Sequence, residues 1–138
     1  MIMNQNFLQQ PDGNINAVLS FMGKEYDVHQ FSISFTQLTD GKGEPQTEVL
    51  GGKLLIGLSQ IPDDALLLWA SNQWMRKDGE VLFRNDTGTP PLRISFKEAY
   101  CISIQQEMVT NQGTRTSIII SPRSVRLNEF TFENSWID

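Results

Sequence analysis

The stretch GGKLLIGLSQIPDDALLLWASNQWMRKDGEVLF, residues 51–83, decides the fold because it places one amphipathic helix between two β-strands. Lys53–Ser59 and Val81–Arg84 have the apolar runs and alternation of strands. Between them, apolar residues at three- and four-residue spacing predict a helix over Pro62–Met75. The stripe consists of Leu66, Trp69, Ala70 and Trp74.

Local chemistry predicts both ends of this helix. Asp63 and Asp64 offer a capping oxygen and negative charge to the first backbone N–H groups, which have no partner within the helix. Arg76 and Lys77 follow the stripe at the negative end of the helix dipole, and Gly79 is a candidate C-terminal cap. The helix is therefore expected to stop before a turn at Asp78-Gly79.

Aromatic residues at helical spacing are far more often packing residues than cofactor contacts. We therefore expect a structural core and no bound cofactor. The predicted core residues are Leu66, Trp69, Trp74, Phe83 and Trp136.

The rest of the chain has the period of two that is typical of β-strands. A hairpin is predicted around Met22-Gly23-Lys24, and Phe31, Ile33 and Phe35 share one face of the next strand. Near Asn128-Glu129 the period slips by one, which predicts a β-bulge. About eight strands with the flanking helix predict a mainly β fold, a small closed barrel or tight sandwich.

Composition limits the organisation and the partners. The 138 residues predict one domain over residues 15–138, preceded by an N-terminal extension over residues 1–14. A net charge of −5 without a concentrated basic face argues against nucleic acid as a partner. The sequence has neither the apolar run of a membrane span nor the pattern of a secretory signal, and its single cysteine suits a reducing compartment. We expect the protein to be made and folded in the cytoplasm.

One polar, glycine-containing segment, residues 39–52, has no burial pattern before Val49-Leu50. Long loops in compact domains are often functional, so this loop is the best candidate for a contact element. It lacks the spacing of a nucleotide-binding phosphate loop. The candidate contact residues are Thr39, Asp40, Gly41, Lys42, Gly43, Glu44, Pro45 and Gln46.

No catalytic or metal-binding pattern is found, so we expect a protein that is not an enzyme. A zinc site needs several Cys and His ligands, and the chain has one of each, Cys101 and His29. A nucleophilic Cys101–His29 pair would require spatial contact, which the sequence alone does not establish. A monomeric barrel that binds a small apolar ligand is the other alternative.

The order of several motifs along the chain resembles the type VI secretion system tube protein, or haemolysin-coregulated protein, family. The similar stretches are Phe21–Val28, Gly51–Leu58, Asp63–Trp74, Gly79–Phe83, Phe96–Ser103 and Glu133–Trp136. The resemblance covers most of the chain from about Asn16 onward. Residues 1–14 are an extension beyond what this family leads us to expect.

The resemblance implies a β-barrel flanked by a helix that assembles into hexameric rings, which stack into a hollow tube. In that family a contractile sheath surrounds the tube, a spike and baseplate complete the machine, and effectors travel in the lumen. It also implies export through the type VI apparatus without a signal peptide and no insertion into a membrane. The segment Thr39–Gln46 resembles the loop that contacts the adjacent ring, and the resemblance transfers no catalytic residue.

Overall fold

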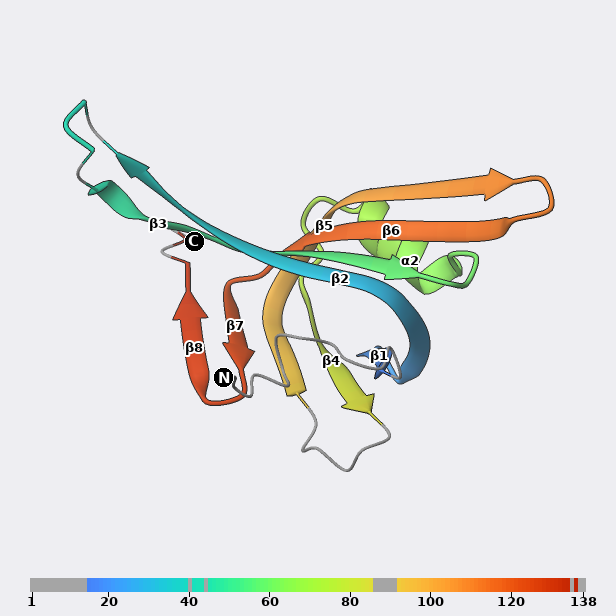
Figure 1. Cartoon of the computed structure of the whole chain (residues 1–138). Helices are drawn as coiled ribbons and strands as arrows, with labels where there is room; N and C mark the ends of the chain where they lie inside the picture. The colour runs from blue at the N-terminus through green and yellow to red at the C-terminus, as the bar shows by residue number, and fades with distance from the viewer. Residues whose placement is uncertain (1–14, 40, 44, 86–91, 135, 137–138) are drawn as a thin grey trace.

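A closed ring of hydrogen-bonded strands forms the body of the protein (Figure 1). The computed structural model describes residues 15–39, 41–43, 45–85, 92–134 and 136. The elements are β1 (Ile15–Phe21), β2 (Lys24–Thr39), β3 (Pro45–Leu58), α2 (Asp64–Ser71), β4 (Lys77–Asn85), β5 (Leu92–Val109), β6 (Gly113–Ser121), β7 (Ser124–Leu127) and β8 (Phe130–Glu133). The neighbours run β4-β1-β2-β3-β6-β5, and a further pairing between β4 and β5 closes the circle. All these pairs are antiparallel, so the predicted mainly β barrel with one helix is confirmed.

Alternating apolar residues fill the inside of this barrel. Leu19, Leu54, Ile56, Ile118 and Ile120 are all fully buried. Their sequence neighbours point to the opposite face, as the pleat of a strand requires. The barrel interior is therefore occupied by side chains.

Helix α2 seals one end of the barrel. Asp63 caps it as predicted, with Oδ1 accepting a hydrogen bond from the Leu66 N–H at 3.0 Å. Trp69 is fully buried, stacks on Phe21 with ring centroids 4.3 Å apart, and donates its indole N–H to the Ala99 carbonyl at 3.0 Å. Burial, stacking and a satisfied polar atom together fix the helix on the barrel.

The helix ends earlier than the sequence predicted. Asn72 has an extended conformation and ends α2, so the predicted limit at Met75 is wrong, and Gly79 lies within β4 instead of capping the helix. Trp74 falls beyond the helix and its residue is 76% exposed, so its assignment to the core is wrong. The helical phase that placed Trp74 in the stripe does not apply after Asn72.

Strand β5 changes partners along its length. Its first part pairs with β4 on one edge and β7 on the other, and its second part pairs with β6. Glu98, with a φ of +49°, lies at a register shift between the two parts, and its N–H donates to Asp78 at 2.8 Å. A second shift follows Cys101, so Cys101 is buried whereas Ile102 is half exposed.

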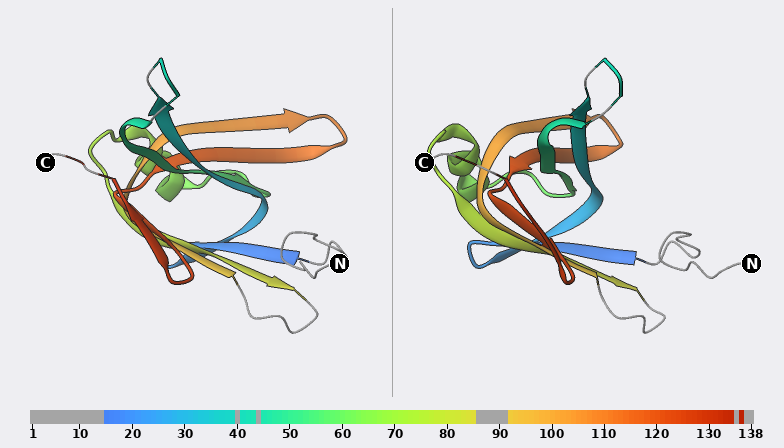
Figure 2. Two further views of the ribbon diagram at one scale, coloured as in Figure 1. Left: turned by 60° about the vertical axis from the view of Figure 1, so that its left-hand side comes forward. Right: turned by 90° about the vertical axis from the view of Figure 1, so that its left-hand side faces the viewer.

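Two long hairpins project from the body. The β2–β3 arm reaches one side of the molecule and the β5–β6 arm the other, as Figures 1 and 2 show. Much of the segment predicted as a long loop, residues 39–52, is strand, because β3 begins at Pro45. The predicted bulge near Asn128-Glu129 is instead the two-residue turn between β7 and β8, where Leu127 pairs with Phe130 and Asn128 has a φ of +55°.

Candidate functional site

The tip of the β2–β3 arm carries part of the predicted contact loop. Gly41, Lys42 and Gly43 are exposed, and the strands below them remain paired up to Thr39 and Pro45. Asp40 and Glu44 lie outside the described residues. The contact role of the loop stays a prediction, but a tip held at the end of a paired arm is well placed to reach another molecule.

Several strand edges have no partner strand within the described residues, and two of them bound the sheet β2-β3-β6-β5. Beyond Val28, β2 pairs with β3 alone, and beyond Tyr100, β5 pairs with β6 alone. These lengths, Gln30–Thr39 and Ser103–Val109, form opposite ends of the four-stranded sheet β2-β3-β6-β5. Such an edge presents backbone donors and acceptors that can pair with another chain. The periodicity of the sequence does not reveal them, because it does not determine which strands pair.

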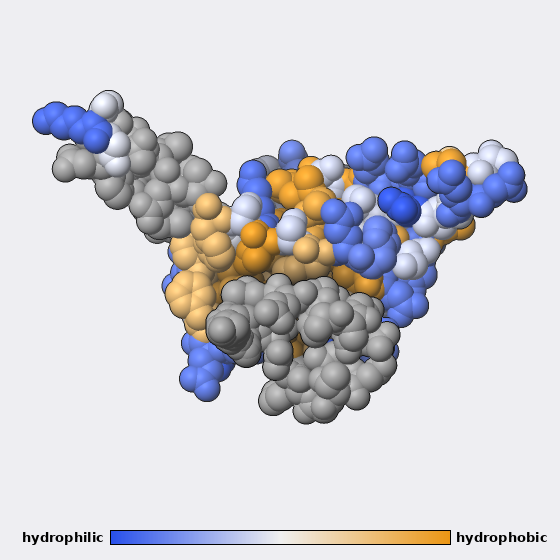
Figure 3. Space-filling view, viewed as in Figure 1, coloured by the Kyte–Doolittle hydropathy of each residue, from blue (hydrophilic) through white to orange (hydrophobic). Residues whose placement is uncertain are grey.

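The face of this sheet opposite α2 consists largely of small polar residues. They alternate with the buried positions of the same strands, and Leu55 and Ile119 form a directly paired apolar contact among them. In Figure 3, hydrophilic residues cover most of the β5–β6 arm. The residues of this outer face are Ser32, Ser34, Lys53, Leu55, Ser103, Gln105, Ser117 and Ile119.

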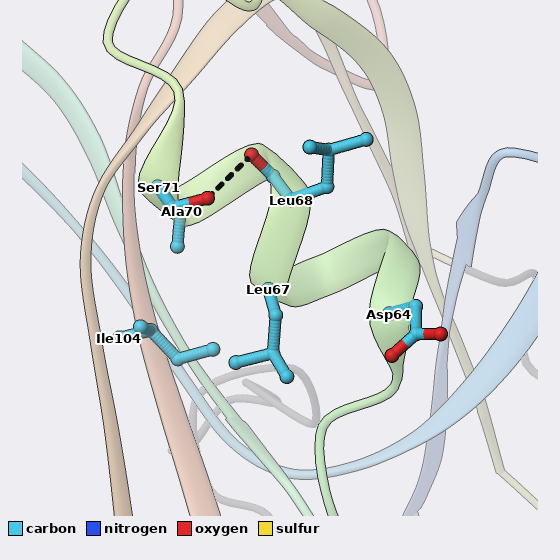
Figure 4. Close-up of a pocket in the computed structure, with 6 residues that line it drawn as sticks. All are labelled: Asp64, Leu67, Leu68, Ala70, Ser71 and Ile104. Atoms are coloured by element: carbon cyan, nitrogen blue, oxygen red, sulfur yellow. Dashed lines mark hydrogen bonds between the residues drawn. The ribbon is translucent and has the colours of Figure 1, made fainter.

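A shallow apolar groove runs between α2 and β5. Leu67 and Leu68 are about half exposed on the outward side of the helix, and Ile104 faces them from β5 (Figure 4). The Ser71 hydroxyl donates a hydrogen bond to the Leu68 carbonyl at 3.3 Å, so the groove has few polar groups directed into it. The groove is lined by Asp64, Leu67, Leu68, Ala70, Ser71 and Ile104. This surface lies outside the barrel, whose interior is already filled.

The carboxylate of Asp63 connects α2 to β2. Its Oδ2 accepts hydrogen bonds from the Tyr26 hydroxyl at 2.8 Å and from the Lys24 ammonium at 3.2 Å. Burial raises the pKa of Asp63, but the hydrogen bonds from Leu66, Tyr26 and Lys24 outweigh it, so its pKa lies below the usual value. Burial and the adjacent Asp63 both raise the pKa of the Tyr26 hydroxyl. These groups form a structural connection that helps to hold the helix in place.

Near the C-terminus, Trp136 lies against a cluster of charged and aromatic side chains. Its ring is 5.3 Å from that of Tyr100, and the guanidinium groups of Arg76 and Arg123 lie 5.7 Å and 5.4 Å from its centroid. Glu98 bridges the two arginines, at 3.0 Å from Arg76 and 3.6 Å from Arg123. Trp136 is therefore partly buried at the surface of the barrel, held by cation–π contacts. Phe83, by contrast, lines the barrel and packs against Phe31.

Cys101 and His29 lie on different strands that are not neighbours. His29 belongs to β2 and Cys101 to β5, and β3 and β6 separate these strands along the sheet. The His29 ring instead lies against β3, where a Cβ added to Gly57 would come within 2.9 Å of it. Burial raises the pKa of the Cys101 thiol to about 11, which disfavours the nucleophilic thiolate. The arrangement does not support the Cys–His alternative.

Among the described residues, no three His, Cys, Asp or Glu side chains gather into a group that could hold a metal ion. None of the described helices has the length and hydropathy to cross a membrane.

Comparisons with known proteins add a family assignment to this geometry. A sequence model described as hemolysin coregulated protein Hcp (TssD) matches residues 13–137. The structure of Hcp1 from Flavobacterium johnsoniae is 28% identical with a TM-score of 0.77, covering 86% of this chain and 99% of that one. No curated protein matches the sequence.

More distant solved structures share the fold. Hcp1 from Salmonella typhimurium is 12% identical with a TM-score of 0.66, covering 86% of this chain and 91% of its own. The secreted protein Hcp3 from Pseudomonas aeruginosa is 11% identical with a TM-score of 0.59, covering 90% of this chain and 99% of its own. At these identities the likeness concerns the fold alone.

Proposed function

The chain belongs to the haemolysin-coregulated protein Hcp (TssD) family of type VI secretion tube proteins, and we propose that it forms homo-hexameric rings that stack into a hollow tube. The observation that carries the proposal is the pair of free strand edges at opposite ends of the sheet β2-β3-β6-β5. These two edges differ, so a contact between them is heterologous and joins copies head to tail. A head-to-tail contact generates a ring when its rotation closes.

Strand direction is compatible with such a contact. Each neighbour in the sheet is antiparallel, so β2 and β5 run in opposite directions. The β2 edge of one copy would therefore meet the β5 edge of the next as an antiparallel pair, in which backbone hydrogen bonds lie perpendicular to the strands. Closure of the ring would pair both of these edges, as closure of a barrel does.

The helix and the closing strands lie on one side of the sheet, which supports one orientation of each subunit in the ring. Helix α2 packs against β5, and the strands β1 and β4 close the barrel on the same side of the sheet. In a ring the wider side of each subunit lies outside, because the circumference is larger there. The sheet face opposite α2, which carries Ser32, Ser103 and Ser117, then faces inward and lines the lumen of the ring. Its small polar side chains would form a smooth wall for secreted effectors.

Stacking requires a second heterologous contact along the ring axis, and the β2–β3 arm supports it. The arm extends beyond the body and carries Gly41, Lys42 and Gly43 at its exposed tip. Each ring repeats the contact, so a modest affinity per subunit multiplies along the tube. The proposed partners of the tube are the contractile sheath, the spike and the baseplate. The protein would be exported through the type VI apparatus.

The experiment is negative-stain electron microscopy combined with native mass measurement of the full chain. We expect annular particles with six times the 15.7 kDa subunit mass, and stacks of them at high concentration. Deletion of residues 42–45 should keep the rings and abolish the stacks. Glu129→Ala, an exposed change in the β7–β8 turn, is the control and should stack as the unmodified protein does.

Each outcome bears on a different contact. Stacks that survive the deletion would contradict the axial role of the arm but leave the ring intact. Monomers of the unmodified protein at every concentration would refute the ring and return the monomeric alternative to consideration.

A further inference from the structure

The groove between α2 and β5 opens at one edge of the sheet β2-β3-β6-β5. Helix α2 packs against β5, the strand at this edge, and Ile104 points toward the helix beside Leu67 (Figure 4). Ile104 pairs with Ile118 on one side and has no partner strand on the other side within the described residues. A strand that joined this edge would therefore place a side chain beside the groove.

The opposite edge of the same sheet carries an exposed aromatic residue. Phe35 lies on the free length of β2, is 41% exposed and meets Phe132 edge to face with ring centroids 5.0 Å apart. This contact holds the Phe35 ring in one orientation and leaves much of it uncovered. Aromatic side chains presented in this way are the anchors that fill pockets in protein interfaces.

Phe35 and Ile104 belong to the same face of the sheet. A row of directly paired residues crosses all four strands, and paired residues point to one face; the row consists of Phe31, Ile56, Ile118 and Ile104. Phe35 lies four residues after Phe31 and so shares this face. In the proposed ring the other face lines the lumen in every copy. The apolar edges of neighbouring copies would then meet on the outer side.

The lengths of the two free edges limit the register between copies. The free edge of β5 ends at Val109, and that of β2 begins at Gln30. An antiparallel pairing that uses the whole β5 edge and begins at the first free residue of β2 sets Val109 opposite Gln30. Five residues back along β5 and five onward along β2, the same register sets Ile104 directly opposite Phe35.

We propose that Phe35 of one copy fills the groove between α2 and β5 of the next copy, against Ile104 and Leu67. This inference rests on the proposed ring and names the side chains that join its subunits. Directly paired side chains have Cβ atoms about 4.5–5.5 Å apart, so a phenyl ring opposite Ile104 reaches the groove. Leu67 and the exposed part of Phe35 both leave water in this contact, which stabilises the ring.

Disulfide trapping tests the register without changing the groove. Ser34 and Gln105 are exposed on the sheet face opposite α2, and the same register sets them directly opposite each other. Oxidation of the variant Ser34→Cys with Gln105→Cys should link the subunits of a ring covalently, up to the hexamer, on denaturing electrophoresis. The link does not form within one chain, because β3 and β6 separate β2 from β5 and a disulfide needs Cβ atoms about 3.5–4.5 Å apart.

The matched control moves one cysteine two residues along β5. In Ser34→Cys with Glu107→Cys the thiols lie about 7 Å farther apart along the strand, so we expect little linkage. Efficient linkage of this pair in place of the first would overturn the assigned register, and with it the placement of Phe35 in the groove.

A double-mutant cycle tests whether Phe35 occupies the groove. Phe35→Ser and Leu67→Ser should each raise about tenfold the protein concentration at which rings dissociate, measured by native mass. The double variant should be little worse than either single variant, because both changes remove the same contact. Within one chain β3 and β6 separate β2 from β5, on which α2 packs, so the coupling reports a contact between copies. Phe130→Ser, a change at an exposed residue beside the β7–β8 turn, is the control and should leave ring dissociation unchanged.

The outcomes separate this inference from the proposed function. Rings whose dissociation is unchanged by Phe35→Ser and Leu67→Ser would overturn the inference, as would additive effects of the two substitutions. The rings themselves persist in both of these outcomes, so the proposed function would stand. Monomers of the unmodified protein at every concentration would refute the ring and the inference together.

Discussion

Replacing Asp63 with alanine tests the connection between α2 and the barrel. The carboxylate accepts the Leu66 N–H at 3.0 Å as the helix cap and the Tyr26 hydroxyl at 2.8 Å as a contact between the helix start and β2. Asp63→Ala removes both interactions at once. The Lys24 ammonium at 3.2 Å loses its partner as well, but its side chain is 56% exposed and water replaces the carboxylate.

The expected loss follows from these contacts. Removal of a capping side chain costs about 1 kcal/mol of unfolding free energy. Tyr26 is only 4% exposed, so a hydroxyl left without an acceptor there costs about 1–3 kcal/mol more. We expect a total of about 2–4 kcal/mol, which is a large share of the roughly 5–15 kcal/mol of a typical domain.

A double-mutant cycle in urea separates the two contributions at fixed protein concentration. Tyr26→Phe removes the hydroxyl that Asp63→Ala would leave without an acceptor, so the double variant should lose less than the sum of the single losses. The adjacent, exposed Asp64→Ala is the control and should cost only a few tenths of a kcal/mol. Strict additivity of the two losses, or a loss below about 0.5 kcal/mol for Asp63→Ala, would refute the reasoning.

Acid unfolding gives an independent view of the same carboxylate. The hydrogen bonds outweigh burial and lower the pKa of Asp63 in the folded state below its ordinary value of 3.8. A depressed folded-state pKa contributes stability above the unfolded-state value, and this contribution is lost as the pH falls through the folded-state pKa. Below about pH 4 the melting temperature of the unmodified protein should therefore approach that of Asp63→Ala.

Two substitution experiments and one labelling experiment follow from the described packing. Gly79→Ala should lower the free energy of unfolding in urea by about 1–3 kcal/mol, because the added Cβ would lie 2.5 Å from a core ring and 2.9 Å from a backbone oxygen. Gly41 has open space around it, so Gly41→Ala should be nearly neutral. Equal losses for the two variants would contradict this reasoning. Trp69→Phe should lower the melting temperature clearly and Trp74→Phe hardly at all, since only the first indole is buried and hydrogen-bonded; the reverse order would count against the packing described. The Cys101 thiol should react slowly with a disulfide reagent at pH 8 and rapidly in denaturant, because burial raises its pKa to about 11; fast labelling of the folded protein would contradict its buried position.

Local chemistry made the start of the helix predictable, and its absence explains the error at the end. The capping geometry of Asp63 depends on a few adjacent residues, which the sequence shows directly. The helix stops at Asn72, whose side chain accepts the Trp74 N–H at 3.1 Å, a local turn that competes with helix continuation. Periodicity alone assigned Trp74 to the apolar stripe of the helix, because it lies four residues after Ala70.

The surfaces proposed for assembly were less accessible to prediction. Residues 45–48 at the start of the arm strand read Pro-Gln-Thr-Glu, so the sequence lacks there the apolar alternation by which half-buried strands are detected. The register shift after Cys101 reverses the faces that simple alternation predicts for Ile102. The free edges of β2 and β5 depend on which strands pair, and no local pattern encodes that choice.

The way in which the barrel closes has a consequence for the order of folding. The β1–β4 pairing joins Phe21 to Gly79 and Ile15 to Asn85, and the β3–β6 pairing joins Leu58 to Thr116. These contacts span about 60 to 70 residues of chain, and such non-local pairing slows folding because loop-closure entropy is lost before the contacts form. The hairpins β2–β3 and β5–β6 are local and are expected to form first. For the ring proposed above, barrel closure would then have to be faster than encounters between the arms of newly made copies.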